Sequence, residues 1–128
     1  MSDQQVQQKI IEAYVKSYNQ FDVAGMSKHL HQDVAFQNVP NGEITLELEG
    51  IEAFRAQAEQ AKALFRSRQQ TVTDMQFDDD TVEVTINYQG MLAQDLPNGL
   101  KAGDTLQLKG KSIFTFAEGK VIKLTDES

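Results

Sequence analysis

Cysteine is absent from the 128 residues of this chain, and long apolar runs are absent too. Without cysteine there is no disulfide framework, no thiolate nucleophile and no cysteine-ligated zinc or iron–sulfur site. No stretch approaches the roughly 18 apolar residues that a membrane span needs. The start, MSDQQVQQK, lacks a basic region followed by an apolar run, so we expect no signal peptide and a cytoplasmic location.

The chain also lacks internal repeats, linkers rich in proline and glycine, and long blocks of like charge. Its length suits a single domain over residues 1–128, with a core large enough to need no covalent staples. The net charge of −7, from 19 acidic and 12 basic side chains, repels phosphate backbones and anionic lipids. We therefore expect neither nucleic acid nor a membrane as a partner and attribute the charge to solubility.

The first part of the chain is predicted to be helical. Apolar residues recur with helical period from Val6 to Tyr18, and Asp22 is a plausible N-cap for a second, short helix. The apolar side of that second helix would carry Val23, Met26 and Leu30. A first strand is expected from Val34 to Val39, with Phe36 and Asn38 on one of its faces.

A third helix is predicted to begin after Gly50, with an apolar stripe that continues to Phe65. From Gln70 the period changes to two, which predicts four further strands joined by turns. Asp78-Asp79-Asp80 is interpreted as a hairpin turn because it lacks the spaced ligands of a calcium loop. The expected inward faces are Thr71, Thr73, Met75 and Phe77; then Val82, Val84, Ile86, Tyr88 and Leu92; then Leu106, Leu108, Gly110, Ser112, Phe114 and Phe116.

Helices that come first and strands that come later indicate an α+β fold. We expect three N-terminal helices packed on the concave face of a strongly curved, mainly antiparallel sheet. Such an arrangement encloses a cone whose mouth is the natural ligand site, since pockets are concave and mostly apolar. The connection from Gln94 to Asp104, which contains Pro97-Asn98-Gly99, either covers that mouth or is only a long hairpin loop.

Three segments carry a resemblance to a known superfamily: Ala13 to Asn38, Gly50 to Phe54, and Ile113 to Ile122. Together they resemble the nuclear transport factor 2-like superfamily, and its SnoaL-like branch in particular, which is related to polyketide cyclases and ketosteroid isomerases. The resemblance covers nearly the whole chain and implies the cystatin-like cone. It does not imply one reaction, because this superfamily includes enzymes, ligand binders and interaction modules.

Comparison with the ketosteroid isomerases is more specific. In that branch a helix tyrosine and a protonated aspartic acid form an oxyanion hole, and an aspartate on the first strand moves the proton. Tyr14 resembles that tyrosine, the base position falls on Asn38, and the second oxyanion donor falls on Ser112. An amide has no useful basicity at neutral pH, so the base of the isomerases is missing here.

What remains is a polar set, Tyr14, Asn38 and Ser112, suited to orienting a carbonyl or hydroxyl group in an apolar pocket. We expect the ligand to be a small hydrophobic molecule that bears oxygen. The expected pocket walls are Phe36, Phe54, Tyr88 and Phe114. No cofactor and no metal site is predicted, since His29 and His31 have no third ligand in obvious register.

Two candidates for a replacement base are left open. Asp126 is one of them. It continues the alternation of Ile122 and Leu124 and so would point inward on the last strand, or else it is a solvated residue in a frayed C-terminal segment. His29 and His31 lie either in a surface turn or at the pocket rim. If the protein is an enzyme, we expect an isomerase or cyclase that uses Tyr14 and one of these bases.

The alternative function is a non-catalytic interaction module in which the cavity is only a packing feature. Mixed polar residues on the convex side of the sheet suit a homodimer interface, and members of the superfamily that this chain resembles often dimerise through that face. The residues expected there are Thr85, Asn87, Gln89, Gln107, Lys109, Ile113 and Thr115.

Overall fold

The computed structural model describes residues 3–97 and 99–127, and Asn98 of the predicted turn lies outside them. The described chain contains three α-helices and one six-stranded sheet. The helices are α1 (Asp3–Asn19), α2 (Val23–Ser27) and α3 (Ile51–Lys62). The strands are β1 (Leu30–Val39), β2 (Leu46–Glu49), β3 (Phe65–Asp78), β4 (Thr81–Leu92), β5 (Thr105–Ala117) and β6 (Lys120–Glu127), and a short 3₁₀ turn, Pro40–Gly42, joins β1 to β2.

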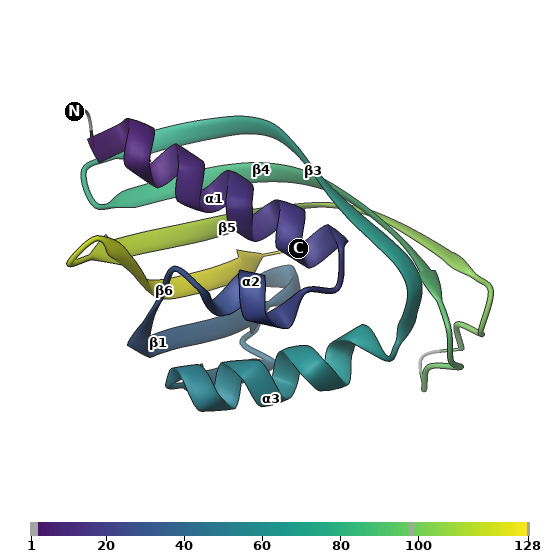
Figure 1. Ribbon diagram of the computed structural model, residues 1–128. Coiled ribbons are helices and arrows are strands. Elements are labelled where there is room, and N and C mark those ends of the chain that lie inside the picture. Colours follow the sequence, from purple (N-terminus) through teal and green to yellow (C-terminus); the bar gives the residue numbers. More distant parts are fainter. Residues whose placement is uncertain (1–2, 98, 128) are drawn as a thin grey trace.

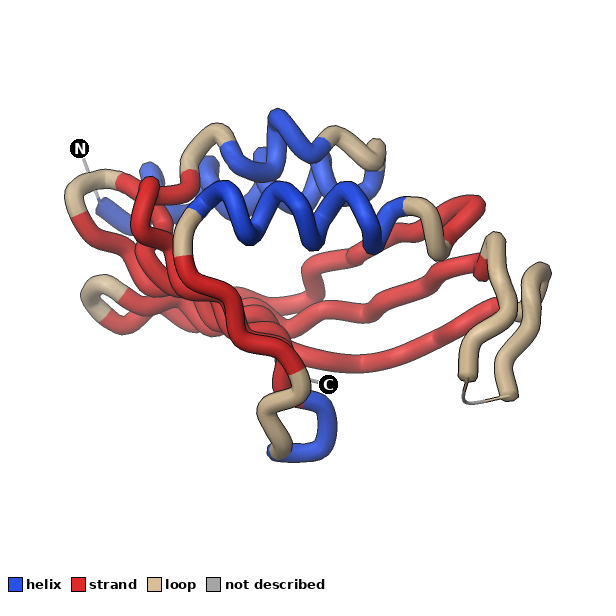
Figure 2. Tube along the Cα trace, turned by 90° about the horizontal axis from the view of Figure 1, so that it is seen from below, coloured by secondary structure: helices blue, strands red, loops and turns tan. Residues whose placement is uncertain are grey.

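The strands lie in the order β2-β1-β6-β5-β4-β3. β1 and β6 run parallel, and every other neighbouring pair is antiparallel. The sheet curves, and the three helices all lie on one side of it (Figures 1 and 2). The predicted α+β class, with helices on one face of a mainly antiparallel sheet, is therefore confirmed. None of the described helices is long and apolar enough to cross a membrane.

Local chemistry explains where the helices begin. The carboxylate of Asp22 accepts a hydrogen bond from the backbone N–H of Gly25 at 3.0 Å, so Asp22 is the N-cap that the sequence predicts. Gly50 precedes α3 with a φ of +89°, which a residue with a side chain adopts only at a cost. Two predicted ends were wrong. Leu30 begins β1 rather than continuing α2, and α3 stops at Lys62, so Phe65 belongs to β3.

β3 contains two irregularities, between Phe65 and Ser67 and between Val72 and Asp74. Each β-bulge changes which residues face the helices, because it inserts one unpaired residue. Met75 and Phe77 pack on the core as predicted. Before the second bulge, the residue that packs on the core is Val72, whereas Thr71 and Thr73, which were predicted to face inward, are exposed. The first half of the inward face is therefore Arg68, Gln70 and Val72, opposite Gly90, Tyr88 and Ile86 of β4.

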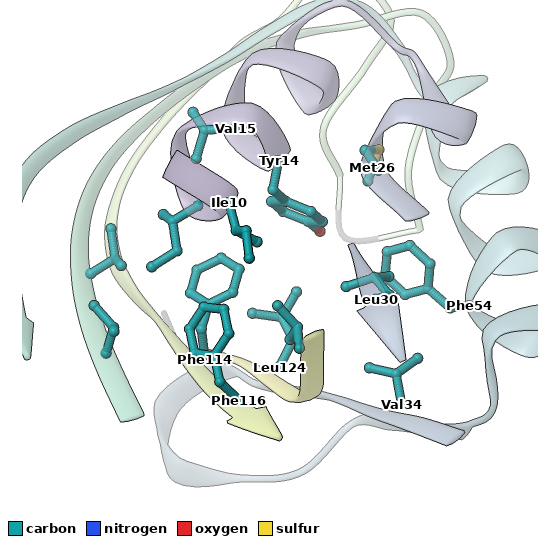
Figure 3. Close-up of a cluster of buried hydrophobic side chains, with 14 of the residues drawn as sticks. Ile10, Tyr14, Val15, Met26, Leu30, Val34, Phe54, Phe114, Phe116 and Leu124 are labelled. Atoms are coloured by element: carbon teal, nitrogen blue, oxygen red, sulfur yellow. The ribbon is translucent and has the colours of Figure 1, made fainter. Parts of the chain in front are cut away.

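The core lies where α1 crosses the middle of the sheet. Its fully buried side chains include Ile11 of α1, Val82 and Val84 of β4, Phe114 of β5 and Leu124 of β6. Figure 3 shows Tyr14 above Phe114, with Met26, Leu30 and Phe54 on its other side. α3 lies over β1, and α2 packs between α1 and α3 (Figure 1). A cavity remains between the helices and the sheet.

Candidate functional site

A cavity of about 390 Å³ opens between the helices and the concave side of the sheet. This volume is in the range of roughly 300–1,000 Å³ that is typical of small-molecule pockets. Its walls are mostly apolar, with contributions from all three helices and all six strands. Seven of the predicted site residues line it: Tyr14, Phe36, Asn38, Phe54, Tyr88, Ser112 and Asp126.

A row of three polar residues crosses the cavity floor on neighbouring strands. Asn38 of β1 is the register partner of Asp126 of β6, and Asp126 is the register partner of Ser112 of β5. Ser112 Oγ donates a hydrogen bond to Asp126 Oδ1 at 2.7 Å. The alternative that Asp126 lies in a frayed C-terminal segment is wrong. β6 continues to Glu127, and Asp126 pairs with Asn38 on one side and with Ser112 on the other.

The carboxyl group of Asp126 is held in a site that disfavours its charge. Burial raises its pKa from the ordinary value of 3.8 to about 6, and the hydrogen bond from Ser112 works against that rise. A carboxyl group with a pKa near 6 exchanges a proton readily close to neutral pH. The cavity therefore contains a carboxyl group that gains or loses a proton near neutral pH, next to Asn38 and Ser112.

Tyr14 supplies a hydrogen-bond donor above this row. Burial raises its pKa well above the ordinary value, the negative charge of Asp126 adds to the rise, and Arg68 opposes it. The phenol is therefore protonated at any working pH. Its ring packs edge-on against Phe114 with centroids 5.6 Å apart, and its oxygen points away from Phe114 toward the side of Met26 and Phe54 (Figure 3).

Phe114 does not have the position that the sequence suggested. It is fully buried beneath Tyr14 in the hydrophobic core and is absent from the described lining of the cavity. The strand parity was right, since Phe114 faces the helices, but α1 covers this part of β5 and fills the space above it. Its role is to support the ring of Tyr14.

The sequence reading missed Arg68, the buried cation of the cavity. Its side chain is only 5% exposed, and the guanidinium carbon lies 3.8 Å from the ring centroid of Tyr18 and 4.6 Å from that of Phe21. Nε donates a hydrogen bond to the backbone oxygen of Tyr18 at 3.0 Å. The alternation Arg68-Gln70-Val72 is the signal for this inward position, but the bulge after Val72 breaks its continuity with Met75.

Tyr18 and Tyr88 close one wall of the cavity together. Their hydroxyl groups lie 3.2 Å apart in a hydrogen bond, and their rings meet edge-on with centroids 6.2 Å apart. Tyr88 also meets the ring of Phe65, at 6.1 Å. Tyr18 therefore lines the cavity as well as packing on the core.

The histidines lie away from the cavity. Nε2 of His31 lies 3.1 Å from a carboxylate oxygen of Glu118, and its Nδ1 accepts a hydrogen bond from the backbone N–H of Asp33. Neither His31 nor His29 is part of the described cavity lining, and neither is any described residue between 94 and 104. Within the described residues, no three acidic or histidine side chains gather as they would around a metal ion.

Residues 11–124 match the family model of the SnoaL-like domain. The chain belongs to the SnoaL-like family. No curated protein sequence matches it significantly. The predicted relationship to SnoaL-like proteins is thereby confirmed.

Solved structures show the same fold at low sequence identity. A proposed polyketide cyclase from Xanthomonas campestris pv. campestris has 21% identity and a TM-score of 0.85, with 99% of this SnoaL-like chain and 93% of that chain covered. TsrD from Streptomyces laurentii has 19% identity and a TM-score of 0.81, with 99% and 90% covered. A cystatin-fold protein from Novosphingobium aromaticivorans has 18% identity and a TM-score of 0.75, with 92% and 94% covered. At these identities the likeness concerns the fold.

Proposed function

We propose that this SnoaL-like protein binds a small hydrophobic molecule that bears a carbonyl or hydroxyl group and transfers a proton on it, as an isomerase or cyclase does. The observation that carries the proposal is the position of Asp126. A carboxyl group with a pKa of about 6 lines an apolar cavity, between two polar side chains that share its register. A non-catalytic packing cavity has no need of such a group.

Tyr14 orients the ligand in this proposal. A phenol that stays protonated donates a hydrogen bond to the ligand oxygen, and this bond strengthens when an enolate develops there. No hydrogen bond of the Tyr14 hydroxyl within the protein is found among the described residues, so the group is available for a ligand. Phe36 and Phe54, which meet edge-on at 5.6 Å, supply apolar wall on the opposite side.

Asp126 replaces the base that the isomerases carry on the first strand. Its carboxylate accepts a proton from the carbon next to the ligand carbonyl, the electron pair moves to the oxygen, and the acid returns the proton elsewhere. Ser112 holds one carboxylate oxygen, which leaves Oδ2 for the transfer. Asn38, exposed at the cavity mouth, offers an amide to a second polar group of the ligand.

Binding is tested with 2-acetylnaphthalene, a neutral aromatic ketone, by calorimetry and thermal shift. We expect the ketone to raise the unfolding midpoint, because a ligand that binds only the native state stabilises it. Phe54→Ala should weaken binding about tenfold by removing wall area. Phe77→Ala, a partly buried residue of β3 outside the cavity lining, serves as the matched control. If neither this ketone nor related phenols bind, the proposal is wrong.

The outward side of β3, β4 and β5 is the face that we propose for a homodimer. Asn87, Gln89, Gln107 and Lys109 are exposed there, and a mixed polar face of this kind suits a dimer interface of moderate polarity. Sedimentation should give a dimer for the native chain and a monomer for Gln89→Arg. A monomer of the native chain at high concentration would contradict this assembly, while leaving the cavity proposal intact.

A further inference from the structure

The cavity contains a buried arginine whose charge is not neutralised by the protein. Within residues 3–97 and 99–127, no carboxylate lies within ion-pair distance of Arg68, although the chain carries a net charge of −7. The cavity's other cation, Lys111, is paired with Glu83 at 2.6 Å. A buried charge is normally paired, because removal from water is costly.

The hydrogen-bond donors of Arg68 are also incompletely used. Nε bonds to the backbone oxygen of Tyr18, and Nη2 has only a long contact of 4.0 Å with the sulfur of Met26. A guanidinium has about five N–H donors in a planar fork. For Nη1 the described residues provide no partner, and Arg68 lines the cavity, so this edge of the fork is available to a ligand.

A second unpaired polar atom lies on the same strand face. Gln70, two residues along β3, lines the cavity, and its Oε1 is buried without a hydrogen-bond partner among the described residues. Its backbone is fixed by Asn19, whose side chain bonds both its N–H and its oxygen. Arg68 and Gln70, two residues apart on β3, thus each carry a polar atom without a partner among the described residues.

Aromatic packing fixes the plane of the guanidinium. Tyr18 and Phe21 lie on it at 3.8 and 4.6 Å, so the fork is oriented before a ligand arrives. Arginine in a fixed plane binds a carboxylate through two parallel hydrogen bonds, which a lysine cannot do. The positive charge of Arg68 also bears on Tyr14, the proposed oxygen-binding group.

We propose that Arg68 is the anchor for a carboxylate on the ligand, so that the natural ligand is an aromatic or polycyclic acid rather than a neutral ketone. This rests on the proposed binding of a small molecule in the same cavity. The carboxylate lies against Nη1 and Nη2 of Arg68, and the apolar body extends toward Tyr14 and Asp126.

The test compares two probes of nearly equal shape, 2-naphthoate and 2-acetylnaphthalene, by calorimetry at about pH 8, where a carboxylic acid is ionised. We expect the native protein to bind the naphthoate about tenfold more tightly than the ketone. Arg68→Gln should remove this preference and leave ketone affinity within about twofold. Arg66→Gln, at an exposed position on the same strand, should keep the preference.

The outcomes separate this proposal from the proposed function. Ketone binding without any preference for the naphthoate overturns the carboxylate anchor alone, whereas failure of both probes to bind overturns both proposals. Equal loss of both probes in a folded Arg68→Gln variant shows that Arg68 acts only by bracing Tyr18, and also overturns the anchor. If Arg68→Gln does not fold, the proposal is judged on whether the native protein binds 2-naphthoate more tightly than 2-acetylnaphthalene. Arg68→Lys should then reduce this preference, and an unchanged preference in that variant overturns the anchor.

Discussion

Ser112 Oγ donates a hydrogen bond to Asp126 Oδ1 at 2.7 Å, across two antiparallel strands that form the cavity floor. The serine stabilises the ionised carboxylate, while burial acts in the opposite direction and prevails. The balance between these two effects gives the group its pKa of about 6.

The stability of the protein should depend on pH through Asp126. Because its pKa is higher in the folded state than the ordinary 3.8, its contribution to stability is fully present below that value and is lost as pH rises through about 6. The Asp126→Asn variant lacks this titration. Its unfolding free energy relative to the native protein should therefore increase by about 3 kcal/mol between acidic and mildly alkaline pH. Urea unfolding measures this difference, and a pH-independent difference would contradict the buried carboxyl group.

Removal of the serine hydroxyl should shift the titration of Asp126. Ser112→Ala deletes the hydrogen bond that favours the charged form, so the pKa of Asp126 should rise above about 6. Carbon-13 NMR of labelled aspartate side chains follows this directly. A matched control is Ser67→Ala, an exposed serine of β3. A pKa that stays constant or falls in Ser112→Ala would show that the serine does not hold the carboxylate.

Two tyrosines one helical turn apart should respond differently to loss of their hydroxyl groups. Tyr14→Phe removes no hydrogen bond found among the described residues, so stability should change by less than about 1 kcal/mol, while ketone affinity should fall about fivefold. Tyr18→Phe breaks the bond to Tyr88 and should cost about 1 kcal/mol of stability. Denaturant unfolding and calorimetry on both variants provide the comparison. Unchanged ketone binding by Tyr14→Phe would remove that residue from the site.

Gly90 should tolerate no side chain without a shift of the cavity wall. A Cβ at this position would lie 3.0 Å from two ring atoms of Phe65 and 3.2 Å from the Tyr88 hydroxyl. Gly90→Ala should therefore lower stability by about 1–3 kcal/mol, as overpacking does. It should also weaken ligand binding, because Phe65 and Tyr88 line the cavity. An alanine variant as stable as the native protein would show that the wall adjusts freely.

The fold and much of the site could be predicted because they follow from patterns within single elements. Helical period, the Asp22 N-cap and strand alternation placed the helices and strands in order, and parity put Tyr88, Ser112 and Asp126 on the inward face. The alternation of residues along a strand does not tell how deeply an inward-facing side chain is buried. Phe114 faces inward as predicted, yet it lies under α1 in the core rather than in the cavity wall.

Arg68 shows a different limit of sequence reasoning. The bulge between Val72 and Asp74 reverses the alternation of β3, so the inward set counted back from Phe77 misses Arg68 and Gln70. Bulges follow from strand twist and cross-strand packing, which a single sequence does not display. The burial of an arginine also contradicts the usual preference of this residue for the surface, and only tertiary contacts reveal it.

The most direct test of the account is exchange of the methyl protons of 2-acetylnaphthalene with deuterium from solvent, followed by NMR. Native protein should catalyse the exchange, with a rate that rises through about pH 6 and then levels off, because the carboxylate form of Asp126 is the base. Asp126→Asn should reduce the catalysed rate about a hundredfold or more, whereas Glu49→Gln, an exposed carboxylate on β2, should not. Equal exchange by native protein and Asp126→Asn would contradict the proposed role of Asp126.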